Sequence, residues 1–187
     1  MNVIIFGPPG AGKGTQAINI SKKFNLYQIS TGDLLRNEVK NKTEIGKDIE
    51  NIISKGDFAT DEIVNELIKK AIFDKNKKNK LIFDGYPRSV SQAKNLESMM
   101  NESNQKIDFI FFLNVSKDTI ISRIEKRKVL EKRADDNLTT ILKRYETYMM
   151  TTKPVLDFYS KKTNFYEIDG SEKIIEISDK IEQILSV

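Results

Sequence analysis

The chain has 187 residues, of which 39% are hydrophobic and 31% charged, a composition typical of one globular domain. It contains neither Cys nor His, which excludes disulfides, thiolate nucleophiles, imidazole catalysis and the usual zinc ligands. The net charge of +4 is too small to indicate a nucleic-acid partner, and we find neither a membrane-spanning apolar run nor a secretory signal. We therefore expect a cytoplasmic protein with no nucleic-acid or membrane partner.

Short apolar segments alternate with segments of helical periodicity, which is the pattern of a parallel sheet with helices on both faces. Strands are predicted at residues 2–6, 26–29, 80–83, 108–113 and 164–168. Helices are predicted at 13–24, as a group within 31–73, and at 89–101, 117–128, 137–161 and 172–185. The predicted fold class is α/β, with five parallel strands.

The segment between the second and third predicted strands is longer than one crossover helix, with about fifty residues where a dozen or more would suffice. Its apolar residues recur at helical spacing, which predicts two or three short helices forming a small insertion. Gly56 indicates a helix end, and Thr60 with Asp61 a new helix start. The basic run at 75–80 is expected to be a solvated loop.

A glycine-rich loop, Gly7-Pro8-Pro9-Gly10-Ala11-Gly12-Lys13-Gly14-Thr15, directly follows the first predicted strand. Between a buried strand and a helix, such a loop turns its backbone N–H groups toward phosphate oxygens, and its lysine adds a cation. It departs from the usual phosphate loop because Gly14 stands where a magnesium-binding hydroxyl is expected. Asp84 ends the third predicted strand; alone it would be read as a turn acid, but beside this loop it predicts a magnesium ligand.

Four motifs occur in one order along the chain: GPPGAGKGTQA at 7–17, ISTGDLLR at 29–36, DGYPRSVSQA at 84–93 and RADDN at 133–137. By these motifs the chain resembles the adenylate kinases of the nucleoside monophosphate kinase family, in their short-lid form, over nearly its whole length. The resemblance implies a monomer with a P-loop NTPase-like fold. It also implies a single domain with its core at 1–29, 60–126 and 138–187, a helical NMP-binding insertion at 30–59 and a very short lid at 127–137.

The same resemblance implies reversible phosphoryl transfer from ATP to AMP, giving two ADP and serving adenine nucleotide homeostasis, with Mg²⁺ and without zinc. It places the ATP phosphates at Gly10, Ala11, Gly12, Lys13, Gly14, Thr15, Arg123 and Arg127. It places AMP at Thr31, Arg36, Asp57, Phe58, Ala59, Gly85, Tyr86, Pro87, Arg88, Gln92, Arg133 and Arg144. The implied catalytic residues are Lys13, Arg88, Arg123, Arg133 and Arg144; Asp33 and Asp84 would hold Mg²⁺ through water, and Asp135 and Asp136 would pair with arginines of the lid.

Other readings of these residues remain open at this stage. A single arginine on a helix is usually a solvated charge, and Thr31 or Asp33 could simply cap a helix. A UMP/CMP kinase on the same scaffold is disfavoured by Thr31 and Gln92, where those relatives tend to carry Ala and Asn. A P-loop ATPase or switch, or a basic RNA-binding protein, explains the arginines less well than a second phosphate-bearing substrate does. We expect the insertion and the lid to move on binding, because ATP must be shielded from water.

Overall fold

The computed structural model describes residues 1–54, 59–131 and 138–186, except for the side chains of residues 51, 53, 54, 127–131 and 138. The strands are β1 (Val3–Phe6), β2 (Tyr27–Ser30), β3 (Leu81–Asp84), β4 (Phe109–Asn114) and β5 (Phe165–Asp169). The helices are α1 (Lys13–Phe24), α2 (Thr31–Lys40), α3 (Glu44–Ser54), α4 (Asp61–Ile72), α5 (Val90–Glu102), α6 (Lys117–Glu131), α7 (Leu138–Thr147), α8 (Lys153–Tyr159) and α9 (Ile174–Leu185). Two short turns complete them, the 3₁₀ turn η1 (Lys75–Lys77) and the π-helical turn η2 (Tyr148–Thr152).

The five strands form one sheet in the order β2-β3-β1-β4-β5, and every neighbouring pair is parallel. The predicted five-stranded parallel sheet is confirmed, with strand boundaries shifted by about one residue. Short runs of Val, Ile, Leu and Phe form these strands because branched and aromatic side chains suit a sheet that is covered on both faces. The strand order reverses direction at β1, which lies between β3 and β4.

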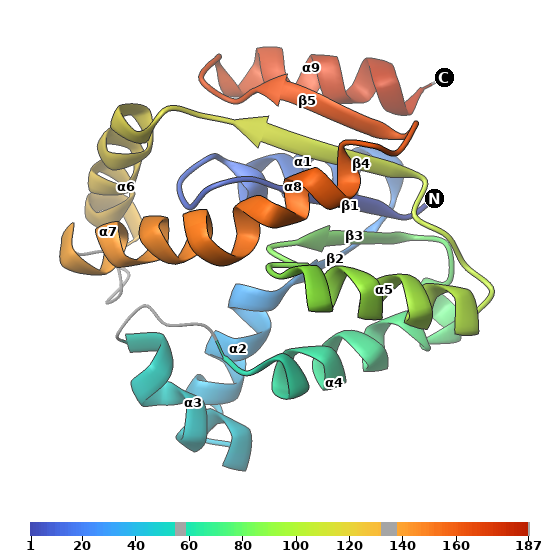
Figure 1. Cartoon of the computed structure of the whole chain (residues 1–187), viewed down its shortest axis with the longest axis horizontal. Coiled ribbons are helices and arrows are strands. Elements are labelled where there is room, and N and C mark those ends of the chain that lie inside the picture. The colour runs from blue at the N-terminus through green and yellow to red at the C-terminus, as the bar shows by residue number, and fades with distance from the viewer. Residues whose placement is uncertain (55–58, 132–137, 187) are drawn as a thin grey trace.

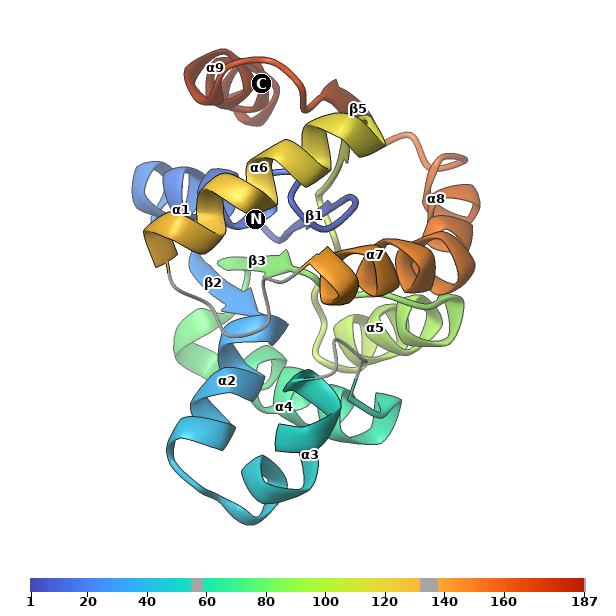
Figure 2. The same ribbon diagram turned by 90° about the vertical axis from the view of Figure 1, so that its left-hand side faces the viewer.

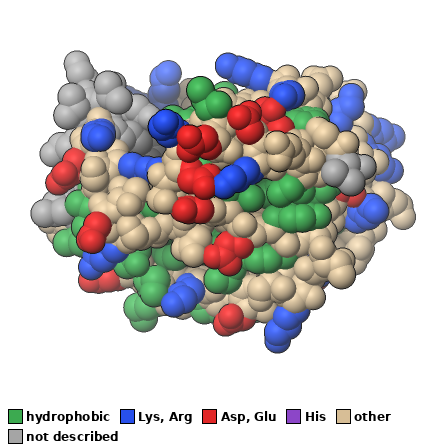
Figure 3. Space-filling model, turned by 90° about the horizontal axis from the view of Figure 1, so that it is seen from above, with side chains coloured by type: hydrophobic (Ala, Val, Ile, Leu, Met, Phe, Trp, Pro, Cys, Tyr) green, Lys and Arg blue, Asp and Glu red, His purple; other side chains and the backbone are tan. Residues whose placement is uncertain are grey.

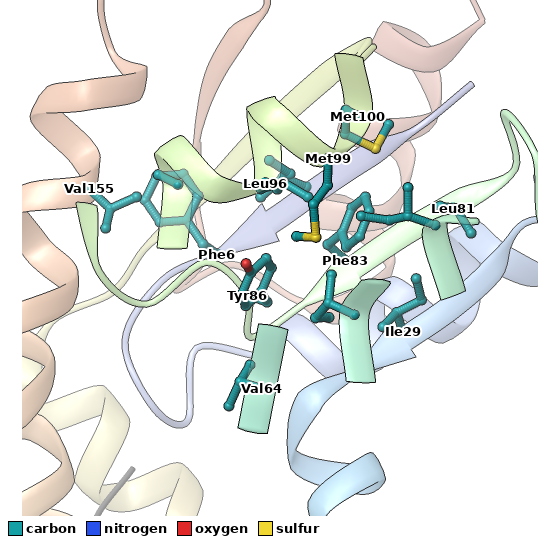
Figure 4. Packing of buried hydrophobic residues seen from close by; sticks show 14 of the residues in the cluster. Phe6, Ile29, Val64, Leu81, Phe83, Tyr86, Leu96, Met99, Met100 and Val155 are labelled. Atoms are coloured by element: carbon teal, nitrogen blue, oxygen red, sulfur yellow. The ribbon is translucent and has the colours of Figure 1, made fainter. Parts of the chain in front are cut away.

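Helices flank the sheet (Figure 1), and the buried hydrophobic side chains form two clusters that we call layers, one on each face. Along β1, Ile4 and Phe6 pack against α4, α5 and α8, whereas Val3 and Ile5 pack against α1, α6 and α9. This alternation follows from the two-residue period of a strand. Figure 4 shows the first layer, in which Tyr86 lies among the apolar side chains. The predicted helices on both faces are therefore confirmed.

The helices α2 and α3 project from the sheet at the end opposite α9 (Figure 2). They pack on each other, and α2 also contacts α4, which returns the chain to the core beneath α5. These helices lie within the predicted insertion at 30–59, whose boundaries stay a prediction. The basic run at 75–80, predicted to be a loop, begins with one turn of 3₁₀ helix, where Lys77 pairs with Asp74 at 2.9 Å.

The predicted helix at 137–161 is interrupted, which corrects the sequence-based expectation. The π-helical turn η2 separates α7 from α8, and Pro154 stands in the first turn of α8. A proline cannot supply the N–H that a continuous helix needs, so the hydrogen-bonding pattern changes before it. The turn places Thr152 so that its hydroxyl donates to the carbonyl of Arg88 at 2.9 Å.

The surface around α9 carries charges of both signs (Figure 3). Lys180 pairs with Glu172 there at 2.5 Å, and Lys23 of α1 pairs with Glu182. Pairs of this kind hold neighbouring elements together only weakly when they are exposed. Among the described helices, none combines the length and apolar content that crossing a membrane requires.

Candidate functional site

A cavity of about 590 Å³ opens at the carboxyl ends of three strands, since Phe6, Ser30 and Asp84 end β1, β2 and β3 and all line it. In open α/β sheets, ligands bind at such an edge, near the strand where the order reverses. The cavity brings together most of the predicted site residues: Gly10, Ala11, Gly12, Lys13, Gly14, Thr15, Thr31, Asp33, Arg36, Ala59, Asp84, Gly85, Pro87, Arg88, Gln92, Arg123 and Arg144.

The phosphate loop forms the end of the cavity between β1 and α1. Gly12 has φ of 94°, a left-handed conformation that a residue with a side chain would adopt only under strain, and it directly precedes α1. Lys13, Gly14 and Thr15, the first residues of α1, line the cavity, so the N-terminus of this helix faces it. Lys13 donates from Nζ to the carbonyl oxygens of Gly7 and Pro8, each at 2.9 Å, which places its ammonium within the bend of the loop.

Asp84 is a nearly buried carboxylate, 8% exposed, beside this loop. Burial raises its pKa, while the nearby charge of Lys13 and a hydrogen bond from Gln28 oppose the rise. The donor in that bond is Nε2 of Gln28, 3.2 Å from Oδ2 of Asp84. A Cβ at Gly14 would lie 3.4 Å from the same oxygen, so the absence of a side chain at Gly14 leaves room next to the carboxylate. The arrangement is a carboxylate poised beside a phosphate-binding loop.

Cationic side chains from three separate elements lie close together: Arg88 after β3, which interacts with Asp84, together with Arg36 of α2 and Arg144 of α7. Burial of the Arg88 guanidinium and, to a smaller extent, the charges of Arg144 and Arg36 together lower its pKa to about 10, although the carboxylate of Asp84 opposes the shift. Arg88 stays protonated at neutral pH, so the group is a concentration of positive charge. Such a concentration is stabilised by an anion, and guanidinium groups suit phosphate in particular.

Asp33 and Arg123, two of the predicted site residues, line the cavity and also contact protein groups. Asp33, predicted to hold magnesium, pairs with Arg36 at 2.6 Å, and its side chain is 61% exposed. Arg123 donates from Nη1 to the carbonyl of Gly170 at 2.6 Å, and from the same guanidinium at 3.3–3.4 Å to Ala11, Ser171 and Glu172. The Arg123 guanidinium thus joins the phosphate loop to the loop between β5 and α9, at the wall of the cavity.

The opposite end of the cavity is formed by α2, the segment after β3 and the start of α5. Ser30, and not Thr31 or Asp33, caps α2, because its Oγ accepts from the N–H of Asp33 at 3.3 Å. The Thr31 hydroxyl instead donates to the Gly85 carbonyl at 2.9 Å, and Nε of Arg88 donates to the same oxygen at 2.7 Å. This end of the cavity is thus built from side chains that cross between elements.

Tyr86 does not line the cavity among the described residues, although it was predicted to contact AMP. It is fully buried in the layer of Figure 4 because its ring packs among apolar side chains. Its hydroxyl donates to Oδ1 of Asn65 at 2.6 Å and lies 3.3 Å from the carbonyl of Gln92. Tyr86 therefore supports the site from within the hydrophobic layer and does not line the cavity.

Several predicted residues lie outside the described part of the chain. Asp57, Phe58, Arg133, Asp135 and Asp136 fall in undescribed segments, and so does the predicted helix end at Gly56. Arg127 lies on α6, whose backbone is described there, but its side chain is not. Their roles stay predictions.

Sequence reasoning missed several polar residues that line or support the cavity. Gln28 and Thr152 line it, and so does Tyr148 of the π-helical turn, while Asp61 holds Gln92. Gln28 gave a weak signal, as a polar residue inside a predicted strand that ends beside a phosphate loop. Thr152 and Asp61 had no readable signal, because each contacts a residue far away in the sequence.

Comparison with known proteins gives one consistent result. The model of the family described as "Adenylate kinase" matches residues 5–164. A protein named adenylate kinase from Pelagibacter ubique (strain HTCC1062) is 50% identical over 213 aligned residues, covering 100% of both chains. Proteins of the same name from Azobacteroides pseudotrichonymphae and Archaeoglobus fulgidus are 43% and 35% identical, covering 97% and 99% of this chain and 95% and 98% of their own. The family match includes the phosphate loop, Asp84 and the three clustered arginines.

The first of these alignments is longer than the chain itself. Its 213 positions exceed the 187 residues present by 26, so this chain lacks residues that the Pelagibacter protein has. The Azobacteroides alignment spans 182 positions and shows no such excess. The Archaeoglobus alignment, with 212 positions, also exceeds the chain, so this chain lacks residues that at least two of these relatives have.

Proposed function

Because the chain belongs to the adenylate kinase family, we propose that the cavity is where it transfers the γ-phosphoryl group of ATP to AMP, giving two ADP. The observation that carries the proposal is the cluster of Arg36, Arg88 and Arg144, which lies next to the phosphate loop in one cavity. A phosphate loop alone suffices for one nucleotide. Three further guanidinium groups suit a second phosphate-bearing molecule that approaches the first.

In this proposal the two ends of the cavity hold the two nucleotides. The N–H groups of the loop at residues 10–15 and the ammonium of Lys13 bind the phosphates of ATP. Thr31, Ala59, Gln92 and the segment 85–88 line the place of AMP, and the amide of Gln92 can both donate to and accept from an adenine edge. The predicted contacts of Arg127, Arg133, Asp57 and Phe58 belong to the same proposal, as does pairing of the lid by Asp135 and Asp136.

The transfer needs alignment and charge neutralisation more than proton movement. An oxygen of the AMP phosphate forms the new bond to the γ-phosphorus, and the bond from that phosphorus to the bridging oxygen of ATP breaks, leaving its electron pair on the departing ADP. AMP is mostly dianionic at neutral pH, because the second pKa of a phosphate monoester is about 6, so no general base is required. Lys13, Arg88, Arg123, Arg133 and Arg144 would neutralise the charge spread over the moving group.

Adenylate kinases use Mg²⁺ with ATP, and the residues here fit that ion. Asp84 offers a buried hard oxygen ligand beside the space at Gly14, and Mg²⁺ prefers oxygen ligands while keeping several of its waters. In the described part of the chain, no group of three or more acidic residues forms an all-protein cage. We propose that Asp84 and Asp33 hold the ion through water, and that the ion, when bound, neutralises charge on the β- and γ-phosphates. Zinc has no Cys or His ligand in this chain.

We also propose an oligomeric state, a set of partners and a location for the enzyme. We propose that it works as a monomer, with only ATP, AMP and ADP as partners. We propose that it acts in the cytoplasm and without nucleic acid. Sedimentation of the purified protein at micromolar concentration tests the monomer, and a dimer would contradict it.

An acceptor panel tests the function. The purified protein is mixed with Mg-ATP and with AMP, CMP, UMP or GMP in turn, and formation of nucleoside diphosphate is followed. Rapid transfer to AMP with little transfer to the others is expected. Equal or faster transfer to UMP or CMP would show a pyrimidine nucleotide kinase, and steady ATP hydrolysis without an acceptor would show an ATPase.

A further inference from the structure

The side-chain amide of Gln92 is held on both sides, in a pair of contacts that we call the amide bracket. Gln92 lies in the first turn of α5 and is 4% exposed. Its Oε1 accepts from the backbone N–H of Arg88 at 2.7 Å, and its Nε2 donates to Oδ1 of Asp61 at 2.6 Å. The bracket therefore joins α5 to the start of α4 and to the segment after β3.

The amide bracket permits one orientation of the amide. A backbone N–H can only donate and an ionised carboxylate can only accept, so Arg88 fixes the oxygen of Gln92 and Asp61 fixes its nitrogen. Turning the amide by 180° would set an N–H against the N–H of Arg88 and an oxygen against the carboxylate. Two independent contacts thus specify the same orientation.

Asp61 is itself held in place by α5. Its second oxygen, Oδ2, accepts from the hydroxyl of Ser91 at 2.6 Å and lies 3.3 Å from the hydroxyl of Ser89. Its first oxygen is thereby left facing Gln92. Asp61 does not line the cavity among the described residues, whereas Gln92 does, so any effect of Asp61 on a bound base passes through Gln92.

The amide keeps one donor and one acceptor for a ligand. An amide has two N–H bonds and two lone pairs, and the bracket uses one of each. Adenine offers a matching pair, the acceptor N1 beside the donor amino group at C6. Hypoxanthine offers the reverse, a donor at N1 beside an acceptor oxygen at C6. A freely turning amide could match both bases, but the amide fixed by the bracket matches adenine only.

We infer that Asp61 is a specificity-determining positioning residue, which fixes the amide of Gln92 so that the acceptor end takes 6-aminopurine and rejects 6-oxopurine nucleotides. The inference rests on the proposed function, because it requires a purine monophosphate at this end of the cavity. Asp61 contributes one of the two obstacles to turning the amide, and the N–H of Arg88 contributes the other.

The test compares AMP with IMP as acceptors, with Mg-ATP as the donor. In Asp61→Asn the side chain keeps its shape, but its amide can present either a donor or an acceptor to Gln92. We expect the ratio of kcat/KM for AMP to that for IMP to fall by about tenfold, as for the loss of one hydrogen bond to a charged group. We also expect kcat/KM for IMP to rise above its wild-type value, and KM for ATP to stay unchanged.

Matched variants separate positioning from simple damage. Glu62→Ala removes an exposed carboxylate from the same turn of α4 and is expected to leave the ratio unchanged. Asp61→Ala, compared at equal thermal stability or below its melting temperature, should lower the ratio like Asp61→Asn. General damage to the site would lower both activities together. An AMP-to-IMP ratio within about threefold of wild type in both Asp61 variants would overturn the inference, since a lost charged hydrogen bond is worth more than that.

The wild-type protein keeps the two proposals distinct. If it transfers to neither AMP nor IMP, the proposed function fails before any variant is made. If it transfers to AMP and the variants keep the wild-type ratio, the function stands and only the role of Asp61 fails.

Discussion

The two ends of the cavity are built in different ways. The donor end is one continuous stretch, in which a strand, a glycine loop and a helix follow one another and most contacts come from the backbone and Lys13. The acceptor end joins α2, α4, α5 and the segment after β3 through side chains such as Thr31, Asp61 and Gln92. The phosphate loop of the donor end is therefore specified locally, whereas the acceptor end exists only once the fold has formed.

The difference between the two ends corresponds to two tasks, the binding of phosphate and the selection of a base. Phosphate is alike in every nucleotide, so a loop of N–H groups and one cation suffice to bind it. A base must be distinguished from other bases, which requires donors and acceptors in fixed orientations. The hydrogen bonds between different elements at the acceptor end hold its donors and acceptors in fixed orientations.

The largest expected effect is at the donor end, in Lys13→Met. This change keeps most of the side chain but removes the cation from the loop, and we expect kcat to fall on the order of 10³-fold. Steady-state kinetics with Mg-ATP and AMP measure it, with Lys22→Met on the exposed side of α1 as the control. A fall smaller than about tenfold would show that Lys13 is not the main cation of the donor end.

At the junction of the two ends, Arg88→Ala should lower kcat by about 10²- to 10³-fold. The fold should survive, because burial and the neighbouring arginines already disfavour the charge of Arg88 in the folded state. Kinetics and a thermal melt of the nucleotide-free protein measure the two effects, with Lys94→Ala on α5 as the control. Turnover near that of wild type would remove Arg88 from the site.

The sequence predicted what depends on neighbours in the chain. The strands and the phosphate loop follow from apolar runs and glycines that lie close together, and the five parallel strands were predicted correctly. The order of the strands in the sheet could not be predicted, because it depends on the position in the sheet to which each crossover connection leads. The contacts of Asp61 with Gln92 and of Arg123 with Gly170 join residues 31 and 47 positions apart, so no local pattern announces them.

A smaller effect is expected in Gly14→Ser, which tests how the donor end holds magnesium. A Cβ there meets Oδ2 of Asp84 at an ordinary 3.4 Å, so the fold should accept the change. The new hydroxyl adds a possible oxygen ligand, and we expect the magnesium concentration for half-maximal rate to fall several-fold. Gly14→Ala, which adds the same Cβ without the hydroxyl, is the control. If both variants depend on magnesium alike, the hydroxyl is irrelevant at this position.

The smallest expected effect is on stability, in Asp84→Asn without nucleotide. Burial raises the pKa of Asp84 above its ordinary 3.8, so the folded state holds this proton more tightly and loses stability as pH rises from 3.8 through the folded pKa. At pH 7 the variant should therefore melt a few degrees higher than wild type, since about 1 kcal/mol moves Tm by roughly 2–4 °C at this chain length.

The advantage of Asp84→Asn should shrink as the pH falls toward 3.8, where both proteins carry a neutral group. Thermal melts between pH 4 and pH 8 measure it, with Asp118→Asn at the exposed start of α6 as the control. A variant less stable than wild type at pH 7 would mean that the bond from Gln28 and the charge of Lys13 outweigh the cost of burial.

The central claim is that two nucleotides meet in one cavity and exchange a phosphoryl group directly. A single-turnover mixture of excess enzyme, Mg²⁺, AMP and ATP labelled with ³²P at the γ-position, quenched over time, tests it most directly. We predict that the label appears in ADP, with one AMP consumed for each ATP and no labelled inorganic phosphate. Label released as inorganic phosphate while AMP stays intact would contradict the account.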